Sequence, residues 1–264
     1  MFEENDFLYL LDERGRRYWI SLRRGMMKIK GLGVIDGDRI MACQDGSRIT
    51  IAGKDFWVLR PGTPELMTSL DRGAQVITPK DAGTILLHLD LKCGDLVLEG
   101  GVGSGSLTVA LVRAVQPQGR VVSVENREDF AERARRNLSR AGLDQCWELR
   151  MDDVRKVELD ESMDAVVLDI PDPWEAVDRV TRLLRPGGRF CAYVPNTNQL
   201  EKTVSTLRLF DFVEIQCLEN LQREMEVHPG GVRPAFQMLG HTGYMVFARL
   251  ASHDGSETGQ HRFI

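Results

Sequence analysis

The stretch Leu98-Glu99-Gly100-Gly101-Val102-Gly103-Ser104-Gly105-Ser106 decides the fold of this chain. Gly101, Gly103 and Gly105 lie at alternating positions between a segment that reads as an apolar strand and one that reads as an apolar helix. Glycine permits a positive φ and lets other groups approach the backbone closely. A strand, a glycine-rich turn and a helix in this order are typical of doubly wound α/β folds, which bind a cofactor at the turn.

On both sides of this turn the chain alternates between expected strands and helices. A helix is expected after Thr78, because Pro79 suits the first helical position, and further helices are expected from Gly105, over 127–140 and over about 174–184. The strands are expected at residues 95–99, 120–124, 146–150, 163–168, 190–194, 213–218 and 244–249. This alternation predicts a Rossmann-like α/β fold, with a mostly parallel seven-stranded sheet covered by helices on both faces.

The first 62 residues follow a different pattern, in which short strands are separated by turns. Strands are expected at residues 18–22, 39–43, 48–52 and 56–59. This spacing predicts a small β-barrel-like domain. Pro61-Gly62-Thr63-Pro64 is a plausible boundary. We therefore expect a β domain over 1–62, a catalytic domain over 63–250 and a disordered tail over 251–264.

Composition limits the class of protein. The chain has 264 residues, of which 42% are hydrophobic and 28% charged, as in ordinary globular proteins. No apolar run approaches the roughly 18–20 residues that cross a bilayer, and the acidic start does not resemble a signal peptide. We expect a cytoplasmic protein that does not contact membranes. Its five scattered cysteines form no C-x-x-C pair, so no metal site is expected.

The charge is unevenly distributed. A net charge of −5 argues mildly against an obligate nucleic-acid binder. The N-terminal part nevertheless carries a basic cluster, made up of Arg14, Arg16, Arg17, Arg23, Arg24, Lys28 and Lys30. Such a cluster is either a solvated strand face or part of an anion-binding surface.

The turn favours S-adenosylmethionine (SAM) over a dinucleotide. The dinucleotide fingerprint G-x-G-x-x-G needs a third glycine where Ser106 stands, whereas E-x-G-x-G-x-G resembles the turn of class I SAM-dependent methyltransferases. Glu125 ends the next strand, 20 residues after Gly105, where a carboxylate can accept hydrogen bonds from both ribose hydroxyls. Asp153, or its neighbour Asp152, follows the third strand and can reach the adenine amino group.

A further acid ends the fourth strand, in Leu168-Asp169-Ile170-Pro171-Asp172-Pro173-Trp174. In this fold Asp169 would face the transferred methyl group, and Trp174 offers a stacking surface. Similar D/N-P-P-aromatic signatures occur in enzymes that methylate exocyclic amines of bases, although the spacing here is wider.

Several motifs together resemble those of the bacterial and archaeal tRNA (adenine-N1)-methyltransferases. They occur in one order: Gln75-Val76-Ile77-Thr78-Pro79-Lys80-Asp81, the glycine turn, Val124-Glu125, the segment from Leu168 to Trp174, and Gly240-His241-Thr242-Gly243-Tyr244. The resemblance covers about residues 10–250. It implies a homotetramer that methylates N1 of adenine-58 in the T-loop of tRNA, with SAM as the methyl donor.

The resemblance also implies roles for individual residues. Asp169 would be catalytic, because it would orient the target adenine through the N6 amino group. SAM contacts are expected from Ile77, Gly101, Gly103, Ser104, Gly105, Ser106, Leu107, Glu125, Phe130, Asp153, Val154 and Asp169. Substrate contacts are expected from Thr78, Trp174, Arg233 and Thr242. His241 is expected to be a hydrogen-bonded core residue rather than a catalyst.

The chain departs from the family pattern at several positions, and other classes remain open. Thr78 stands where many relatives have an aromatic residue or histidine, Gly100 and Val102 replace the usual alanine and threonine, and Met225 stands near a position where an aromatic residue is usual. The alternatives are a protein isoaspartyl or corrin-ring methyltransferase and a non-catalytic RNA-binding subunit with a methyltransferase fold. A nicotinamide oxidoreductase is disfavoured by Ser106.

Overall fold

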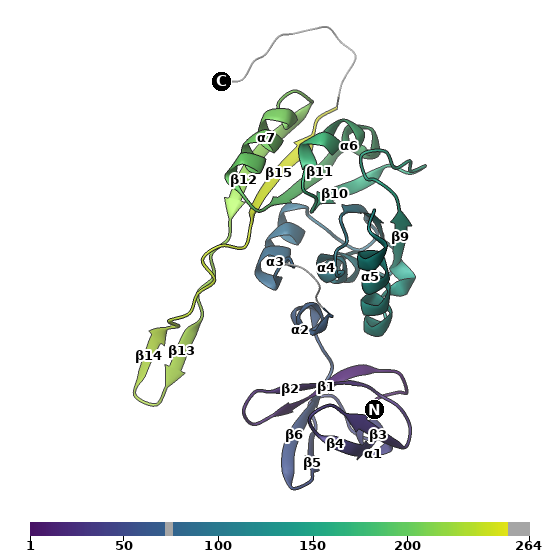
Figure 1. Ribbon diagram of the computed structural model, residues 1–264, viewed down its shortest axis with the longest axis vertical. Coiled ribbons are helices and arrows are strands. Elements are labelled where there is room, and N and C mark those ends of the chain that lie inside the picture. Colours follow the sequence, from purple (N-terminus) through teal and green to yellow (C-terminus); the bar gives the residue numbers. More distant parts are fainter. Residues whose placement is uncertain (72–75, 253–264) are drawn as a thin grey trace.

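A small β domain forms the N-terminal end of the protein in the computed structural model, which describes residues 1–71 and 76–252 (Figure 1). Its elements are β1 (Phe7–Asp12), β2 (Arg17–Ser21), β3 (Met26–Ile29), β4 (Gly33–Asp36), α1 (Gly37–Met41), β5 (Arg48–Ile51) and β6 (Lys54–Leu59). They form an antiparallel sheet in the order β2-β1-β6-β5 and a separate β3-β4 ribbon. The expected small β domain is therefore present.

One expected strand of this domain is wrong. Residues 39–43 lie in and after helix α1, because the carboxylate of Asp36 accepts a hydrogen bond from the backbone N–H of Asp38 at 3.0 Å and caps the helix. Ile40 on this helix is fully buried in the core of the domain. Strands β1, β3 and β4 were not expected; β1 is a run of mostly apolar residues that follows a turn at Glu4-Asn5.

The larger α/β part follows helix α2 (Thr63–Ser69) (Figure 1). Its helices are α3 (Pro79–His88), α4 (Ser106–Val115), α5 (Glu128–Ala141), α6 (Val177–Leu183) and α7 (Thr197–Leu207), with 3-10 turns η1 (Asp144–Cys146) and η2 (Pro173–Ala176). Its strands are β7 (Leu96–Gly100), β8 (Arg120–Glu125), β9 (Trp147–Met151), β10 (Met163–Leu168), β11 (Leu184–Val194), β12 (Phe212–Glu219), β13 (Met225–His228), β14 (Gly231–Pro234) and β15 (Tyr244–Leu250).

Seven of these strands form one sheet in the order β12-β15-β11-β10-β7-β8-β9. The five strands from β11 to β9 are parallel, and β15 runs antiparallel to β11 and β12. Two buried apolar clusters cover the faces, one with side chains from α2, α3 and α4 and the other with side chains from α6 and α7. The expected Rossmann-like fold is confirmed.

Some boundaries differ from the expectation. The helix expected from Trp174 begins as η2 and becomes α-helical only at Val177, and Arg185-Pro186-Gly187-Gly188 lies within strand β11 at a break in its pairing with β10. Of the tail that we expected to be disordered, only Ala251 and Ser252 belong to the described residues. None of the helices in the described ranges is long and apolar enough to cross a bilayer.

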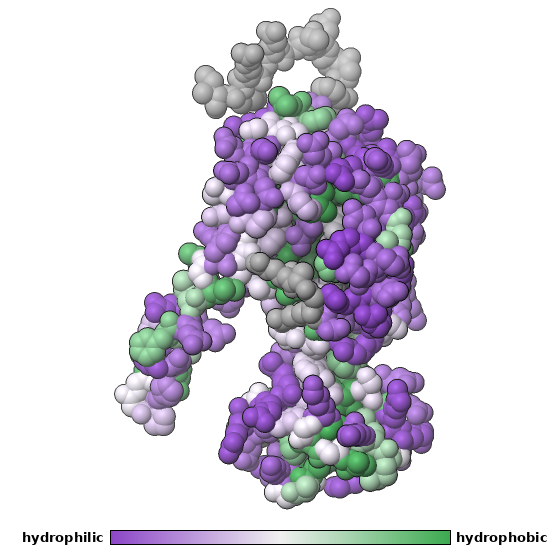
Figure 2. Space-filling model, viewed as in Figure 1, coloured by the Kyte–Doolittle hydropathy of each residue, from purple (hydrophilic) through white to green (hydrophobic). Residues whose placement is uncertain are grey.

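A hairpin that was not expected projects from the sheet edge. Strands β13 and β14 pair with each other in a two-stranded ribbon, which with its connecting segments (residues 221–241) we call the arm (Figure 1). The arm exposes large apolar side chains, namely Leu221, Met225, Val227, Val232, Phe236, Met238 and Leu239 (Figure 2). A two-stranded ribbon is marginally stable alone in water, and contiguous exposed apolar side chains often mark protein contact surfaces. The arm has both properties, as expected for an element that packs against a partner.

The departure at Gly100 has a packing explanation. A Cβ atom on Gly100 would lie 2.7 Å from Cδ2 of Leu168 and 3.1 and 3.2 Å from the Cγ atoms of Val154. Leu168 and Val154 are both buried. The room that an alanine methyl would need is therefore filled from the neighbouring strand end and the segment after β9.

We predict opposite effects of two glycine-to-alanine substitutions. Gly100→Ala overpacks this contact and should lower the free energy of unfolding by about 1–2 kcal/mol. Gly83→Ala, in helix α3, should raise it by about 0.5–1 kcal/mol, because no atom lies within 4 Å of the place that the new methyl group would take. Urea unfolding of both variants is the measurement. A stabilised Gly100→Ala variant would show that the site is not crowded.

Candidate active site

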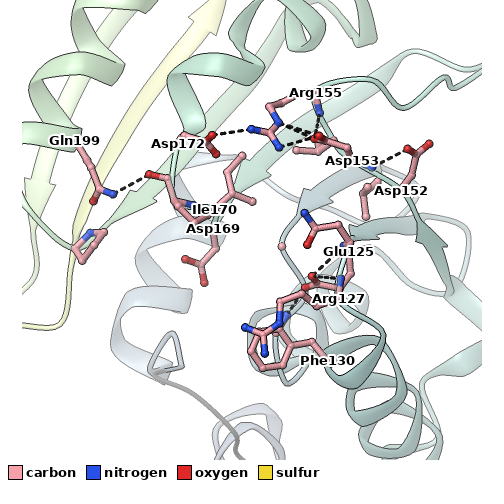
Figure 3. Close-up of a pocket in the computed structure, with 17 residues that line it drawn as sticks. Glu125, Arg127, Phe130, Asp152, Asp153, Arg155, Asp169, Ile170, Asp172 and Gln199 are labelled. Carbon is pink, nitrogen blue, oxygen red and sulfur yellow. Dashed lines mark hydrogen bonds and ion pairs between the residues drawn. The ribbon is translucent and has the colours of Figure 1, made fainter.

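A cavity of about 600 Å³ opens at the carboxyl ends of the parallel strands (Figure 3). This edge of a doubly wound sheet is where such folds bind ligands. The cavity is lined by Gly101, Gly103, Val124, Glu125, Asn126, Arg127, Phe130, Asp152, Asp153, Val154, Arg155, Asp169, Ile170, Pro171, Asp172, Pro195 and Gln199.

The glycine turn adopts a conformation that requires glycine. Gly101, Gly103 and Gly105 have φ angles of +85°, +53° and +81°. A Cβ atom on Gly101 would lie 2.2 Å from the carbonyl oxygen of Asp169, and one on Gly105 would lie 2.5 Å from Cδ2 of Leu138. The turn therefore packs directly against the end of β10 and against α5, and Gly105 caps helix α4.

The two serines of the turn have different environments. The hydroxyl of Ser106 donates a hydrogen bond to the carbonyl oxygen of Ile77 at 3.0 Å and joins the turn to the segment before α3. The hydroxyl oxygen of Ser104 is buried and has no hydrogen-bond partner among the residues that the structure describes. Ser104 lines a small pocket beside the turn together with Ile77 and Asp169. A buried hydroxyl without a partner is costly, so this one is suited to a ligand.

Leu107 and Ile77 line the small pocket beside the turn, although their side chains are largely buried. Leu107 is 5% exposed and Ile77 is 3% exposed, and both belong to the main apolar core. The backbone N–H groups in the first turn of α4 remain available to an anionic group of a ligand.

Glu125 is fixed at the cavity wall by backbone donors. Its Oε1 accepts hydrogen bonds from the N–H groups of Asn126 and Arg127, both at 3.0 Å, and its Oε2 accepts one from Gly103 at 3.3 Å. A carboxylate has about four lone-pair positions, so capacity remains for a ligand hydroxyl. Phe130 lies beside it at the start of α5, with the guanidinium carbon of Arg127 3.8 Å from the ring centroid (Figure 3).

Asp153 is held by an arginine that sequence reasoning missed. Nε of Arg155 lies 2.8 and 3.0 Å from the two carboxylate oxygens of Asp153, and this pairing holds the pKa of Asp153 below its usual value. Nη1 of the same arginine donates to Asp172 at 2.7 Å. Arg155 thus links the loop after β9 to the loop after β10 (Figure 3). Asp152, the alternative to Asp153, also lines the cavity.

Asp169 follows the last residue of β10, and its carboxylate points into the cavity (Figure 3). Its backbone N–H donates to the carbonyl oxygen of Gly100 at 2.8 Å, which fixes its position. The residue is exposed to the cavity, although many protein atoms lie around its carboxylate and limit its hydration. This desolvation, with a smaller contribution from the charge of Glu125, raises the pKa of Asp169 to about 7.

Glu99 is a second buried acid behind the turn. It is 1% exposed, and its Oε2 accepts hydrogen bonds from the hydroxyls of Ser123 at 2.5 Å and Thr108 at 2.8 Å. Burial raises its pKa to about 8, although both hydroxyls act in the opposite direction and the charges of Asp169 and Glu125 add a smaller increase. Glu99 is therefore mainly protonated at neutral pH.

The residues expected to bind substrate do not gather at the large cavity. Thr78 caps α3 and donates to the Asp81 carboxylate at 3.1 Å, and Thr242 lies buried where the chain returns from the arm. Trp174 lies on η2, 5.0 Å from the Lys202 ammonium. Arg233 pairs with Glu226 on the arm, where strand β14 projects from the sheet (Figure 1), and it does not line the cavity. The structure thus brings the expected cofactor residues together. Of the second set, Thr78 and Thr242 meet at the Asp81–Lys80 pair, whereas Trp174 and Arg233 lie apart from them.

His241 is not in the core, contrary to the expectation. It is exposed at the base of the arm, where Nδ1 lies 2.7 Å from a Glu219 carboxylate oxygen and Nε2 lies 3.0 Å from the carbonyl oxygen of Pro195. The hydrogen bond with Glu219 is the main reason why the pKa of His241 is raised. The expected hydrogen bonding of this histidine is confirmed.

The cavity fits SAM on three observations. The glycine turn brings free backbone to its wall, the buried Ser104 hydroxyl has no partner within the described residues, and acids at the wall favour the positive sulfonium and ammonium groups of SAM. When bound, SAM supplies an electrophilic methyl group. Fold and site together define a class I SAM-dependent methyltransferase.

Comparison with known proteins gives the family. Residues 55–232 match the model of the family described as tRNA methyltransferase complex GCD14 subunit, and the chain belongs to this family. It is 33% identical to the tRNA (adenine(57)-N(1)/adenine(58)-N(1))-methyltransferase TrmI of Methanocaldococcus jannaschii, over 91% of this chain and 94% of that one.

Two solved structures extend the comparison. The tRNA (m1A58) methyltransferase TrmI from Aquifex aeolicus is 28% identical with a TM-score of 0.78, over 94% of this chain and 98% of that chain. A SAM-dependent O-methyltransferase from Thermotoga maritima is 32% identical with a TM-score of 0.85, over 96% of this chain and 95% of that chain.

We predict that substitution of Ser104 affects SAM binding, whereas substitution of Ser106 affects the stability of the fold. Ser104→Ala should weaken SAM binding about 10-fold and leave the melting temperature unchanged, because the hydroxyl makes no bond within the described protein. Ser106→Ala should lower stability by about 1 kcal/mol through loss of the bond to Ile77. Calorimetric SAM titration and thermal unfolding measure the two effects. Unchanged SAM affinity in Ser104→Ala would show that this hydroxyl does not contact the cofactor.

Proposed function

We propose that this protein methylates N1 of adenine-58 in the T-loop of tRNA, with SAM as the methyl donor. The observation that carries the proposal is the position of Asp169, whose carboxylate points into the cavity beside the glycine turn. Family membership and the M. jannaschii relative support tRNA as the substrate. We further propose that SAM contacts the residues that the sequence assigned to it, with Arg155 holding Asp153 in place.

The reaction requires positioning more than proton transfer. Adenine N1 carries a lone pair in the plane of the ring, so it can attack a methyl group without first losing a proton. The product is cationic. The Asp169 carboxylate can accept a hydrogen bond from the N6 amino group, which orients the ring and stabilises the positive charge as it develops. This role needs Asp169 in its charged form, without a general base.

The target base must leave its stack to reach the cavity. The seven residues of the N-terminal basic cluster are all exposed in the structure, which supports a role in holding the tRNA backbone. Because the whole chain is acidic, tRNA binding is expected to use such local basic surfaces, from more than one subunit. A tRNA substrate also supports a cytoplasmic location.

We also propose that the enzyme is a homotetramer in which the arm packs against a second copy of the chain. The resemblance to the TrmI group suggests the assembly. The arm supports it, since Val227 and Val232 face each other across the ribbon and are 72% and 64% exposed. If Arg233 does contact substrate, its place on the arm favours the active site of a neighbouring subunit over its own.

Glutamate substitutions on the arm should disrupt the assembly. Val227→Glu and Val232→Glu would bury charge in the proposed interface, so we expect dimers or monomers in analytical ultracentrifugation. Val34→Glu, at a site 62% exposed in the β domain, is the matched control and should remain tetrameric. Arm variants that sediment as tetramers would exclude this interface.

The activity is tested with purified protein, SAM and unmodified tRNA, followed by mapping of the methylated nucleotide. We expect 1-methyladenine at position 58, and Asp169→Asn should lower kcat/KM by a factor on the order of 100 because it loses the charge. Mapping also reports whether adenine-57 is modified. If the wild-type protein binds SAM but methylates no tRNA, the proposed function is wrong.

The pH profile of the same reaction tests the role of Asp169. Its carboxylate fraction grows with pH, so kcat/KM for SAM, which reports the free protein, should fall as the pH drops through about 7, the pKa of Asp169 in that form. Glu99→Gln should keep this break, because Glu99, with a pKa of about 8, is already mainly neutral at pH 7 and below. Asp169→Asn should flatten it. A wild-type profile of kcat/KM for SAM that is flat from pH 6 to 8, roughly one unit on either side of that pKa, would show that Asp169 does not control the reaction through its charge in the free protein.

A further inference from the structure

Lys80 is a buried cation at the start of α3, outside the cavity. Its side chain is 11% exposed, and its ammonium lies 2.7 Å from each of three oxygens: Oδ1 of Asp81, the carbonyl oxygen of Asn220 and Oγ1 of Thr242. An ammonium has three N–H donors, so these three partners use all of them. Lys80 and Asp81 belong to a motif that the sequence analysis singled out, and the reaction described above gives them no role.

Two of these partners, Asn220 and Thr242, flank the arm at its two ends, which we call its roots. Asn220 directly follows β12, where the chain leaves the sheet for the arm, and Thr242 lies just before β15, where it returns (Figure 1). The Asn220 side chain adds hydrogen bonds to the carbonyl oxygen of Lys80 at 2.9 Å and to the hydroxyl of Thr84 at 3.0 Å. Both ends of the arm are therefore fixed to the first turns of α3.

The same cluster reaches the strand beside Asp169. Oδ2 of Asp81 accepts a hydrogen bond from the Tyr193 hydroxyl at 3.2 Å, and Tyr193 lies on β11, which pairs with β10. A Cβ atom on Gly243 would lie 2.4 Å from the Tyr193 ring, so the returning arm packs closely on this ring. Burial is the main reason why the pKa of Tyr193 is raised, and the charges of Asp81 and, to a lesser extent, Asp169 add to the increase.

A role in stability alone explains this cluster poorly. Removing two charges from water costs more than a buried ion pair usually returns, and apolar residues of similar size often serve as well. The ammonium can donate hydrogen bonds to a carboxylate, a carbonyl and a hydroxyl from three parts of the chain, and it thereby holds them together. An apolar side chain cannot do this.

We propose that Lys80 is a positioning residue that fixes both roots of the arm against α3 and thereby sets the acceptor side of the active site beside Asp169. This proposal rests on the proposed function, because it assigns Lys80 to tRNA methylation rather than to SAM binding. Lys80 does not line the cavity. Its loss should therefore affect the acceptor step and leave the affinity for SAM almost unchanged.

The test compares Lys80→Met with the double variant Lys80→Met/Asp81→Asn, in which no unpaired buried charge remains. In both we expect the dissociation constant for SAM to change less than about 2-fold, and kcat for tRNA methylation to fall on the order of 10- to 100-fold. The melting temperature should fall in Lys80→Met and recover in the double variant. Lys92→Met, at a lysine side chain 65% exposed that precedes β7, is the matched control and should retain wild-type kcat.

Hydrogen–deuterium exchange provides a readout that does not depend on activity. Backbone exchange over residues 219–244 should rise in both Lys80 variants and stay at the wild-type level in Lys92→Met. The proposal is overturned if the double variant regains wild-type kcat and exchange, because Lys80 would then only neutralise Asp81. It is also overturned if SAM affinity falls in parallel with kcat. If the wild-type protein methylates no tRNA, the proposed function fails, whereas unchanged exchange in the Lys80 variants rejects the anchoring role by itself.

Discussion

The contact between the glycine turn and the end of β10 is the constraint on which the site depends. The backbone N–H of Asp169 donates to the carbonyl oxygen of Gly100, and that of Gly101 donates to the carbonyl oxygen of Val124. The ends of β7, β8 and β10 are thereby joined at one point. Since a methyl on Gly101 would overlap the Asp169 carbonyl oxygen, only glycine allows this approach. The close approach places the proposed catalytic acid directly beside the cofactor turn, and a side chain at position 101 would separate them.

Electrostatics at this junction favours a cationic ligand. Glu99, Glu125 and Asp169 lie near enough to affect one another, and desolvation raises the pKa of Asp169 to about 7 and that of Glu99 to about 8. In the free protein, proton uptake by Glu99 and partly by Asp169 reduces the repulsion. A bound cation would relieve it instead and favour the charged form of Asp169, the form that can hold an amino group. In the proposed reaction, binding of the cofactor and preparation of the acceptor side would thus be linked through Asp169.

The sequence predicted the parts of the fold that depend on local patterns. The sheet, the glycine turn and the positions of Glu125 and Asp169 at strand ends follow from short-range periodicity and from where parallel strands end. The helix over Gly37–Met41 was mistaken for a strand, because five residues are too few to distinguish the two periods. The roles of Arg155 and Lys80 could not be predicted because their partners are set by the fold: Asp172 lies 17 positions from Arg155, and Thr242 lies 162 from Lys80. An arginine two residues after Asp153 was the only sign of the first pairing in the sequence.

The two sets of expected residues differ in how they are assembled. A single chain forms the whole proposed SAM pocket, but it does not gather all the residues expected to bind the acceptor tRNA. Every side chain that lines the cavity comes from strand ends of the same sheet or from the segments that follow them, so folding alone assembles it. Of the expected acceptor residues, Thr78 and Thr242 meet at the Asp81–Lys80 pair, whereas Trp174 lies on η2 and Arg233 on the arm. Folding of a single chain does not bring all four together. A large, folded RNA is better matched by a surface that extends over several elements and over neighbouring subunits than by one enclosed pocket, and the arm is the element whose placement decides whether such a surface exists.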